Sequence, residues 1–379
     1  MSKNKKRKNS GQWIGVLIYM LIGAACGILI LRYMDLIAGE DGHIGKQIML
    51  FGVLALSVYA AMALQTVIHE TGHLVFGLAT GYQFSSFRIF SWMLLKENGK
   101  LRFRRLSIAG TGGQCLMAPP ELKDGKMPFL LYNFGGAIMN LIASAIFFGI
   151  SLVLPSSSVL TLILQVLALI GASFAVINGV PLRLGPVDND GCNALSMMRS
   201  SEAVRAFHLQ LKANELVSKG VRLKDMPAEW FIVPEDESMR NSIIASAGVL
   251  CCNRLMDEHR FEEADTLMEH LLSIESGIVE LYRRLMTCDR IFVEAVSRNR
   301  KEVLEGLMTA EQEKMMKAMK QFPSVLRTKY VLALLSDGDE VKARETEKEF
   351  ESCALKYPYP SDIAAERELM QIAKDRVAS

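Results

Sequence analysis

Four long apolar stretches limit what this chain can fold into more than any other feature of its sequence. Each contains a run of 19 to 28 residues without a charged side chain. A helix needs about 20 apolar residues to cross the hydrocarbon core of a bilayer. We therefore predict an α-helical integral membrane protein with four transmembrane helices, at about residues 13–32, 46–79, 128–154 and 157–181.

The charges divide the chain into two parts of opposite sign. Residues 1–187 carry 16 Lys and Arg against 7 Asp and Glu, whereas the remaining residues carry 27 against 34. This division excludes a single soluble globule and a disordered chain, and it indicates a membrane domain followed by a soluble domain. We predict a basic cytoplasmic tail over residues 1–12, a transmembrane domain over 13–195 and a soluble domain over 196–379.

The soluble domain has the pattern of an all-α structure. Its apolar residues recur at three- and four-residue spacing, which is typical of amphipathic helices. One segment, Cys251–Leu272, resembles a tetratricopeptide-type unit, but no repeat period can be fixed. The sequence therefore predicts either a tetratricopeptide-like domain or a plain helical bundle. Helical repeats are common binding surfaces, so this domain is a candidate site for a protein partner. We expect no nucleic-acid partner.

The loops predict the orientation of the chain in the membrane. The N-terminal tail and the loop at about 81–127 are rich in Lys and Arg, which favours the cytoplasmic side. The first loop holds Asp35, Glu40 and Asp41 against Lys46, which suits the outside. We therefore expect a multi-pass protein with both termini in the cytoplasm. The seven cysteines are odd in number and irregularly spaced, so we expect reduced thiols on the cytoplasmic side.

The loop between the second and third predicted helices has the pattern of β structure. Phe87–Leu95 and Leu101–Ile108 are candidate strands, and Asn98-Gly99 between them is typical of a two-residue hairpin turn. We predict a β hairpin over residues 86–109, inserted into the transmembrane domain. The following segment, Gly110–Gly113, lacks the Gly-Lys-Ser/Thr ending of a phosphate-binding loop, so we expect a connector there.

One motif at the end of the second apolar helix has the residues of a metal site. It reads His69-Glu-Thr-Gly-His73. Residues four apart lie on one face of a helix, so both imidazoles can bind one metal ion. Glu70 lies beside them, where it can take a proton from a metal-bound water. Ionisable groups are costly at the end of an apolar helix unless they are paired, bind metal or face water, and a polar helix end is the alternative interpretation.

A catalytic zinc usually has three protein ligands and one open position, so two histidines leave the site incomplete. The fourth predicted helix ends on the same side of the membrane as His73. It is followed by Asp188-Asn-Asp190-Gly191, which brings two acidic side chains towards the histidines. Asp188 and Asp190 are therefore both candidate third ligands.

Three motifs resemble those of the site-2 protease family, the intramembrane zinc metalloproteases, over about residues 48–195. The first is His69–His73. The second, Gly135-Gly-Ala-Ile-Met-Asn140, is similar to the Gly-Pro-x-x-Asn element of the family. The third, Asn178-x-x-Pro181 followed by Asp190-Gly191, is similar to its Asn-x-x-Pro…Asp-Gly element. The inserted hairpin is also a feature of the family, and the whole arrangement resembles bacterial members with a C-terminal helical cytoplasmic domain in the cytoplasmic membrane.

The resemblance implies a role for each motif. Zinc would be held by His69, His73 and Asp190, with Glu70 as the general base. Residues Leu182–Val187 separate Asn178 from the acids more widely than is usual in the family, so Asp188 is a rival ligand or a partner of a histidine. The resemblance assigns Asn140 and Asn178 to the substrate or the developing oxyanion. For Asn140, an interhelical hydrogen bond is an equal alternative.

We predict from these motifs a zinc-dependent intramembrane endopeptidase. It would cleave a membrane-spanning or membrane-associated peptide near the cytoplasmic face, through a water activated by Glu70. One alternative is a catalytically silent membrane scaffold whose helical tail binds a partner. A zinc carrier or sensor is another, but His43 is the only further histidine in the membrane half, so a ligand path through the bilayer is missing.

Overall fold

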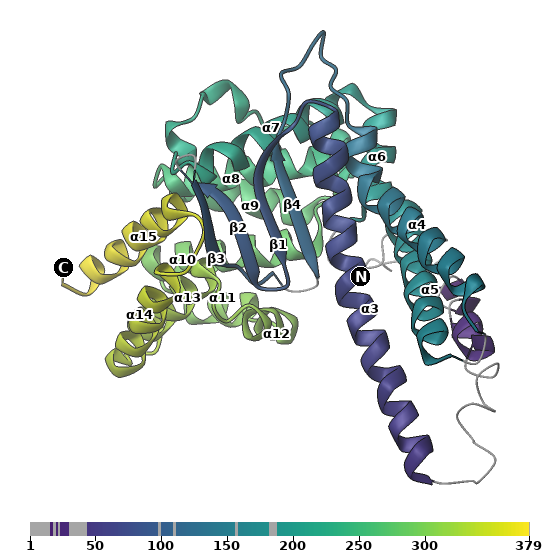
Figure 1. Ribbon diagram of the computed structural model, residues 1–379. Helices are drawn as coiled ribbons and strands as arrows, with labels where there is room; N and C mark the ends of the chain where they lie inside the picture. The colour runs from purple at the N-terminus through teal and green to yellow at the C-terminus, as the bar shows by residue number, and fades with distance from the viewer. Residues whose placement is uncertain are drawn as a thin grey trace, which may run out of the picture. The chain divides into compact units, whose positions relative to one another are not determined.

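The structure of the protein is a computed structural model (Figure 1). It describes residues 16–17, 20–21, 23–29, 44–97, 100–108, 111–155, 158–181 and 188–378. The predicted basic tail lies outside these residues, and the helix predicted at 13–32 is described only in part. That first membrane span therefore stays a prediction.

Three helices within the described ranges are long and apolar enough to cross a membrane. They are α3 (Ile44–Ala79), α4 (Leu130–Val153) and α5 (Val159–Gly179), and they coincide with the second, third and fourth predicted spans. Large apolar side chains such as Leu56 and Val153 are exposed on them, as expected for a surface that faces lipid.

Glycines let α3 and α4 approach closely. A Cβ atom added to Gly72 would lie 2.2 Å from the carbonyl oxygen of Gly135, and one added to Gly135 would lie 2.6 Å from that of Gly72. Neither backbone could accept a side chain there without moving. Small residues have this role at helix crossings in membranes, where close backbone contact replaces the hydrophobic effect. The crossing lies beside His69 and His73 and thus fixes the surroundings of both.

The inserted segment forms a four-stranded antiparallel sheet in the order β3-β2-β1-β4. The strands are β1 (Gln83–Ile89), β2 (Trp92–Glu97), β3 (Lys100–Arg105) and β4 (Gly113–Ala118). The predicted hairpin corresponds to β2 and β3, in which Glu97 pairs with Lys100. Its turn residues, Asn98 and Gly99, lie outside the described part of the chain.

The prediction of one strand over Phe87–Leu95 was wrong. The chain turns at Phe90, whose φ of 52° lies in the left-handed region, and β1 and β2 pair back on each other. The buried guanidinium of Arg88 stabilises this turn, because it donates to the carbonyl oxygens of Phe90 and Gly113 and to the hydroxyl of Thr111. Thr111 and Gly112 connect β3 with β4 as predicted, whereas Gly113 is already the first residue of β4.

The remaining chain is helical, as the three- and four-residue spacing predicted. A short helix, α6 (Asp190–Arg199), is followed by α7 (Ser201–Ser218) and α8 (Ser242–Asp257). The later helices are α9 (Phe261–Ser273), α10 (Glu280–Ser297), α11 (Lys301–Leu307), α12 (Ala310–Ala318), α13 (Pro323–Val331), α14 (Glu340–Ala354) and α15 (Pro360–Ala378). The tetratricopeptide-like character of this array stays a prediction.

The chain divides into two compact units that do not follow its linear order. The first comprises Met1–Gly81 and Pro128–Leu195, and the second comprises Tyr82–Met127 and Ser196–Ser379. The sheet thus shares a unit with the C-terminal helices and not with the apolar ones. Met93 and Leu106 belong to the same buried apolar cluster as residues of α8, α9 and α10.

Candidate metal centre

The two histidines of the motif lie one turn apart on α3, and both are buried. In each imidazole, Nδ1 forms a hydrogen bond with an oxygen atom of α4. The Nδ1–H of His73 donates to the backbone carbonyl oxygen of Tyr132 at 2.7 Å. The Nδ1–H of His69 donates to Oδ1 of Asn140, also at 2.7 Å. A carbonyl oxygen can only accept, so the proton of a neutral imidazole is on Nδ1 in both cases and the Nε2 lone pair is free to bind a metal.

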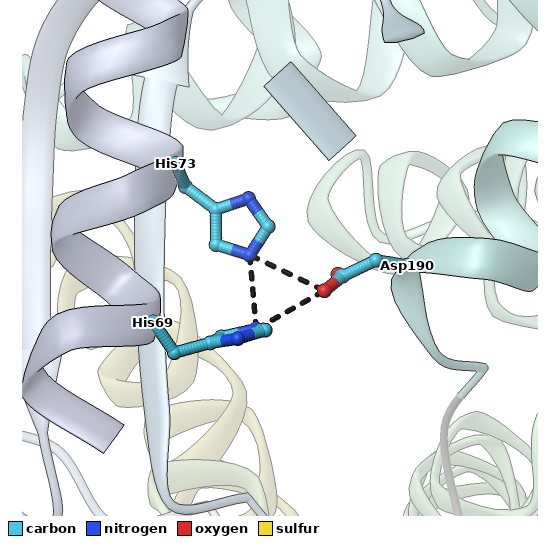
Figure 2. Close-up of side chains that lie close together, drawn as sticks. All are labelled: His69, His73 and Asp190. Carbon is cyan, nitrogen blue, oxygen red and sulfur yellow. Dashed lines mark hydrogen bonds and ion pairs between the residues drawn. The ribbon is translucent and has the colours of Figure 1, made fainter. Parts of the chain in front are cut away.

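Asp190 completes the group from the first residue of α6 (Figure 2). Its Oδ2 lies 3.1 Å from Nε2 of His69 and 3.3 Å from Nε2 of His73. The two Nε2 atoms are 3.2 Å apart. Burial would raise the pKa of Asp190, but the two imidazoles lower it below its ordinary value, so this donor is a carboxylate. Three atoms with lone pairs therefore converge on one point.

The distances within this group fit a zinc ion. Four ligands at about 2.0–2.1 Å in a tetrahedron stand about 3.3 Å from one another. The three edges of the donor triangle, 3.1, 3.2 and 3.3 Å, are close to that length. Two imidazole nitrogens and one carboxylate oxygen are also a donor set that zinc accepts, with a fourth position left open. The residues present therefore fit the metal that the sequence motif predicts.

Asn189 and Gly191 hold Asp190 in place. Asn189 donates from Nδ2 to the carbonyl oxygens of Ile177 and Val180 at the end of α5, both at 2.6 Å. Its Oδ1 accepts from the backbone N–H of Cys192 at 2.9 Å, as an N-cap does. A Cβ atom on Gly191 would lie 2.4 Å from the carbonyl oxygen of Gly179. A glycine is therefore required for α6 to start so close to α5.

The structure places the other predicted site residues differently. Glu70 is buried on α3 and interacts electrostatically with His73. Asn140 is fully buried behind His69, and its Nδ2 donates to Gln65 across the interface between α3 and α4, which is the interhelical hydrogen bond that the sequence left as an alternative. Asn178 donates to the carbonyl oxygen of Phe174 within α5. Among the described residues, Asp188 is not part of the group that could hold a metal ion.

Sequence reasoning missed two residues that shape the centre, because Gln65 hydrogen-bonds with Asn140 and Asn189 holds Asp190. Gly136, which belongs to the second motif, makes room for the imidazole of His69, whose atoms a Cβ would approach to 2.5 Å. For Gln65 a signal was available: it is a lone amide in an apolar run, four residues before His69 and hence on the same helix face.

These features define a class of protein. Two imidazoles on an apolar helix long enough to cross a membrane, together with the carboxylate of Asp190, form the candidate metal centre of a membrane-associated protein. A comparison with protein families identifies that class more closely, because the profile described as Peptidase family M50 matches residues 57–332, well over half of the chain. The chain therefore belongs to this family of metallopeptidases, the site-2 protease family. Comparisons of the sequence with curated proteins and of the chain with solved structures find no match.

Proposed function

We propose that the protein is a zinc-dependent endopeptidase of the membrane that cleaves a membrane-spanning or membrane-associated peptide near the cytoplasmic face. The convergence of His69, His73 and Asp190 is the observation that carries this proposal. Membership of a metallopeptidase family supports the proposal. It is also supported by the position of the donors, because His69 and His73 lie on the apolar helix α3 and Asp190 follows the apolar helix α5 in the chain.

The residues of the centre can divide the reaction among them. Zinc, when bound, would supply a Lewis acid that lowers the pKa of water and polarises a peptide carbonyl. Glu70 takes the proton of the attacking water and then passes it to the leaving amine. The apolar helices around the site exclude bulk water, which strengthens the electrostatic interactions within it. Since both donors of the Asn140 amide are used by Gln65, we assign Asn140 to the support of His69 and leave Asn178 as the candidate for substrate contact.

The substrate has to be extended at the bond that is cleaved, because a helix hides its own amides. Helix-breaking residues or partial unwinding of the substrate are therefore part of the proposal. We also propose that the unwound strand pairs with the edge strand β3, as peptides do when they add to a sheet.

The proposed function is tested first by the zinc content of the full-length protein in detergent. We expect about one zinc per chain in the wild type, as for a mononuclear catalytic site. Asp190→Ala should lose this zinc, and Asp188→Ala should keep it. A loss with Asp188→Ala alone would move the third ligand to Asp188. A well-folded wild type that takes up no zinc, even when zinc is supplied, would contradict the proposal and favour the scaffold alternative.

Glu70→Gln separates catalysis from metal binding. A probe substrate would be a single spanning helix interrupted by Gly and Asn near its cytoplasmic end, reconstituted with the enzyme in vesicles. Loss of a general base should lower the cleavage rate by about 10²–10⁴-fold while the zinc content stays that of the wild type. Cleavage at the wild-type rate by this variant would exclude Glu70 as the base.

A further inference from the structure

The helices of the second unit enclose a cavity of about 340 Å³. It lies where α7, α8, α10, α13 and α15 meet, and all of its lining residues belong to that unit. Asn253 on α8 lines it and is exposed, so the cavity opens to the surface there. Sites for small ligands are concave and usually have volumes of this order. The cavity is therefore large enough to bind a ligand.

Acidic side chains dominate the charged part of the cavity wall. Four carboxylates line it: Asp257, Asp289, Asp362 and Glu366. Arg222 is the cation among the described lining residues. Carboxylates are costly to remove from water unless cations and hydrogen-bond donors compensate them. The partners of each acid therefore show whether the protein itself balances their charge.

Two arginines pair with three of the four carboxylates. Nε of Arg222 donates to Oδ1 of Asp257 at 2.9 Å. Arg327 is fully buried and serves two acids, because its Nη2 donates to Asp289 at 2.6 Å and its Nε lies 3.1 Å from Glu366. One guanidinium carries a single positive charge. The pair of Asp289 and Glu366 therefore keeps one negative charge that Arg327 does not balance.

The fourth carboxylate, Asp362, forms no ion pair with a described residue. The hydroxyl of Tyr357 donates a hydrogen bond to it. Burial, together with the charge of Asp257, raises the pKa of Asp362 to about 7, and burial also raises the pKa of Glu366 to about 7. Four carboxylates thus face two guanidinium groups, and the wall has an excess of negative charge that a bound cation would balance.

The uncharged part of the wall fits the rest of a basic peptide residue. Phe322 and Tyr357 line the cavity with their ring centroids 6.1 Å apart, and aromatic rings attract ammonium and guanidinium groups. Asn214 and Asn253 also line it, and neither side chain hydrogen-bonds with a described residue. An amide side chain has both donors and an acceptor, as a peptide backbone does. These two amides are therefore suited to bind the backbone of an extended peptide.

We propose that this cavity binds an arginine or lysine side chain of a peptide, with its cationic head against Asp362 and Glu366. Such a residue carries its charge on an apolar stem, which matches a wall that is acidic at one place and apolar elsewhere. The peptide backbone lies against Asn214 and Asn253. A free amine has the same charge without the peptide groups, and the test has to separate the two. The inference concerns the second unit alone and does not depend on the metal centre.

The first experiment is calorimetric titration of the full-length protein in detergent with three probes. One is a tripeptide with a central arginine and both ends blocked. The second has citrulline in place of arginine and so keeps the shape without the charge. The third, butylguanidinium, has the charge without the peptide groups. We expect saturable binding of the arginine peptide at one site, with the other two probes at least about tenfold weaker, since hydrogen bonds to charged groups contribute most to such binding.

The other results of this titration are equally decisive. Absence of saturable binding by both cationic probes would overturn the inference. Equal binding of the arginine and citrulline peptides would also overturn it, because the charge would then have no part in recognition. Tighter binding of butylguanidinium than of the arginine peptide would overturn the assignment to a peptide and identify a free amine as the ligand.

Asp362→Asn tests the carboxylate that no described cation balances. Asparagine keeps the shape of the side chain and can still accept from Tyr357, so we expect this variant to fold. The control is Asp375→Asn, the same change at an exposed position of α15 outside the cavity. Asp362→Asn should weaken binding of the arginine peptide by about 10–100-fold, and Asp375→Asn should leave it unchanged. An equal loss in both variants would indicate attraction to the general surface charge and would overturn the inference.

A second variant fills the cavity and keeps every charge. Ala365 lines the cavity on α15, so Ala365→Leu places three additional carbon atoms in the space for the ligand. We expect it to weaken binding of the arginine peptide by at least about tenfold, because interiors have little room to adjust. Thermal unfolding confirms that the variant is folded. Wild-type affinity in a folded Ala365→Leu protein would place the bound cation outside the cavity and overturn the inference.

Discussion

Asn189 shows how much of the candidate centre depends on residues that are not donors themselves. Its amide binds two carbonyl oxygens at the end of α5 and the N–H of Cys192 in the first turn of α6. Helix ends leave such groups without partners inside the helix, and here one side chain serves both ends. The carboxylate of Asp190 is attached to the residue that follows, so its position depends on this double cap.

Asn189→Ala should therefore weaken zinc binding by about tenfold, the lower end of the effect expected for a residue that orients a ligand. It should also cost about 1–2 kcal/mol of stability, as the loss of a helix cap does. Ser158→Ala is the matched control, because Ser158 caps the other end of α5. Chelator competition and thermal unfolding measure the two effects. Equal zinc affinities in both variants would show that Asp190 does not need Asn189.

The sequence predicted the donors of the centre but not their supports, and the reason is physical. His69, Glu70 and His73 are neighbours on one helix, so their spacing alone predicts their geometry. Gln65 acts on Asn140, 75 residues away, and on Leu167, 102 residues away. Hydrogen bonds over such separations have no local sequence pattern. They become visible only when three helices are packed together.

At the level of elements, the apolar helices were predictable because a bilayer requires long charge-free runs. The sheet was predicted only in part. Asn98-Gly99 is a standard hairpin signal, and the pairing of Glu97 with Lys100 agrees with it. The turn at Phe90 has no Gly, Asn or Pro and depends on the buried Arg88, a tertiary contact that no turn preference contains.

The strand β3 has an edge that fits the proposed pairing with a substrate. The N–H of Leu106 points back to Ser91 before β2, whereas the N–H of Arg105 points away, to the carbonyl oxygen of Lys356. Because these directions alternate along a strand, the N–H groups of Leu101 and Phe103 also point away from β2. Both side chains are exposed, at 61% and 73%. The other edge strand, β4, packs against α7.

Leu101→Pro and Phe103→Pro should each slow cleavage of the probe substrate, since proline removes an outward N–H that the substrate strand would use. The inner hydrogen bonds of the sheet would remain. Leu101→Ala and Phe103→Ala are the controls, because they shorten the same side chains and keep the N–H. Cleavage rates at saturating zinc decide the matter. Proline and alanine variants with the same rate would exclude pairing at β3.

At the scale of the whole molecule, the chain passes back and forth between its two units. It leaves the apolar helices after Gly81 to build the sheet, returns at Pro128, and leaves again after Leu195. The charge pattern along the sequence could not reveal this association. The basic sheet belongs to the basic part of the chain, residues 1–187, whereas the helices that it packs with belong to the acidic part, residues 188–379. Their association depends on apolar contacts such as those of Met93 and Leu106, which form part of a cluster made mostly by the C-terminal helices.

The sheet should therefore depend on the C-terminal helices for its stability. In a chain that ends at Ser200, the buried sides of Met93 and Leu106 would be exposed to water, and the apolar face of a sheet has to be buried against another element for the sheet to be stable. We expect limited proteolysis to cut the shortened chain within residues 82–127 and to spare this segment in the full-length protein. His69, His73 and Asp190 all belong to the other unit, so zinc binding should persist.

Leu106→Ala in the full-length chain tests the same contact without truncation. It should destabilise the second unit by about 2–5 kcal/mol, as buried leucine-to-alanine changes do. If residues 82–127 resisted the protease equally in the chain that ends at Ser200 and in the full-length chain, the sheet would be stable without the C-terminal helices.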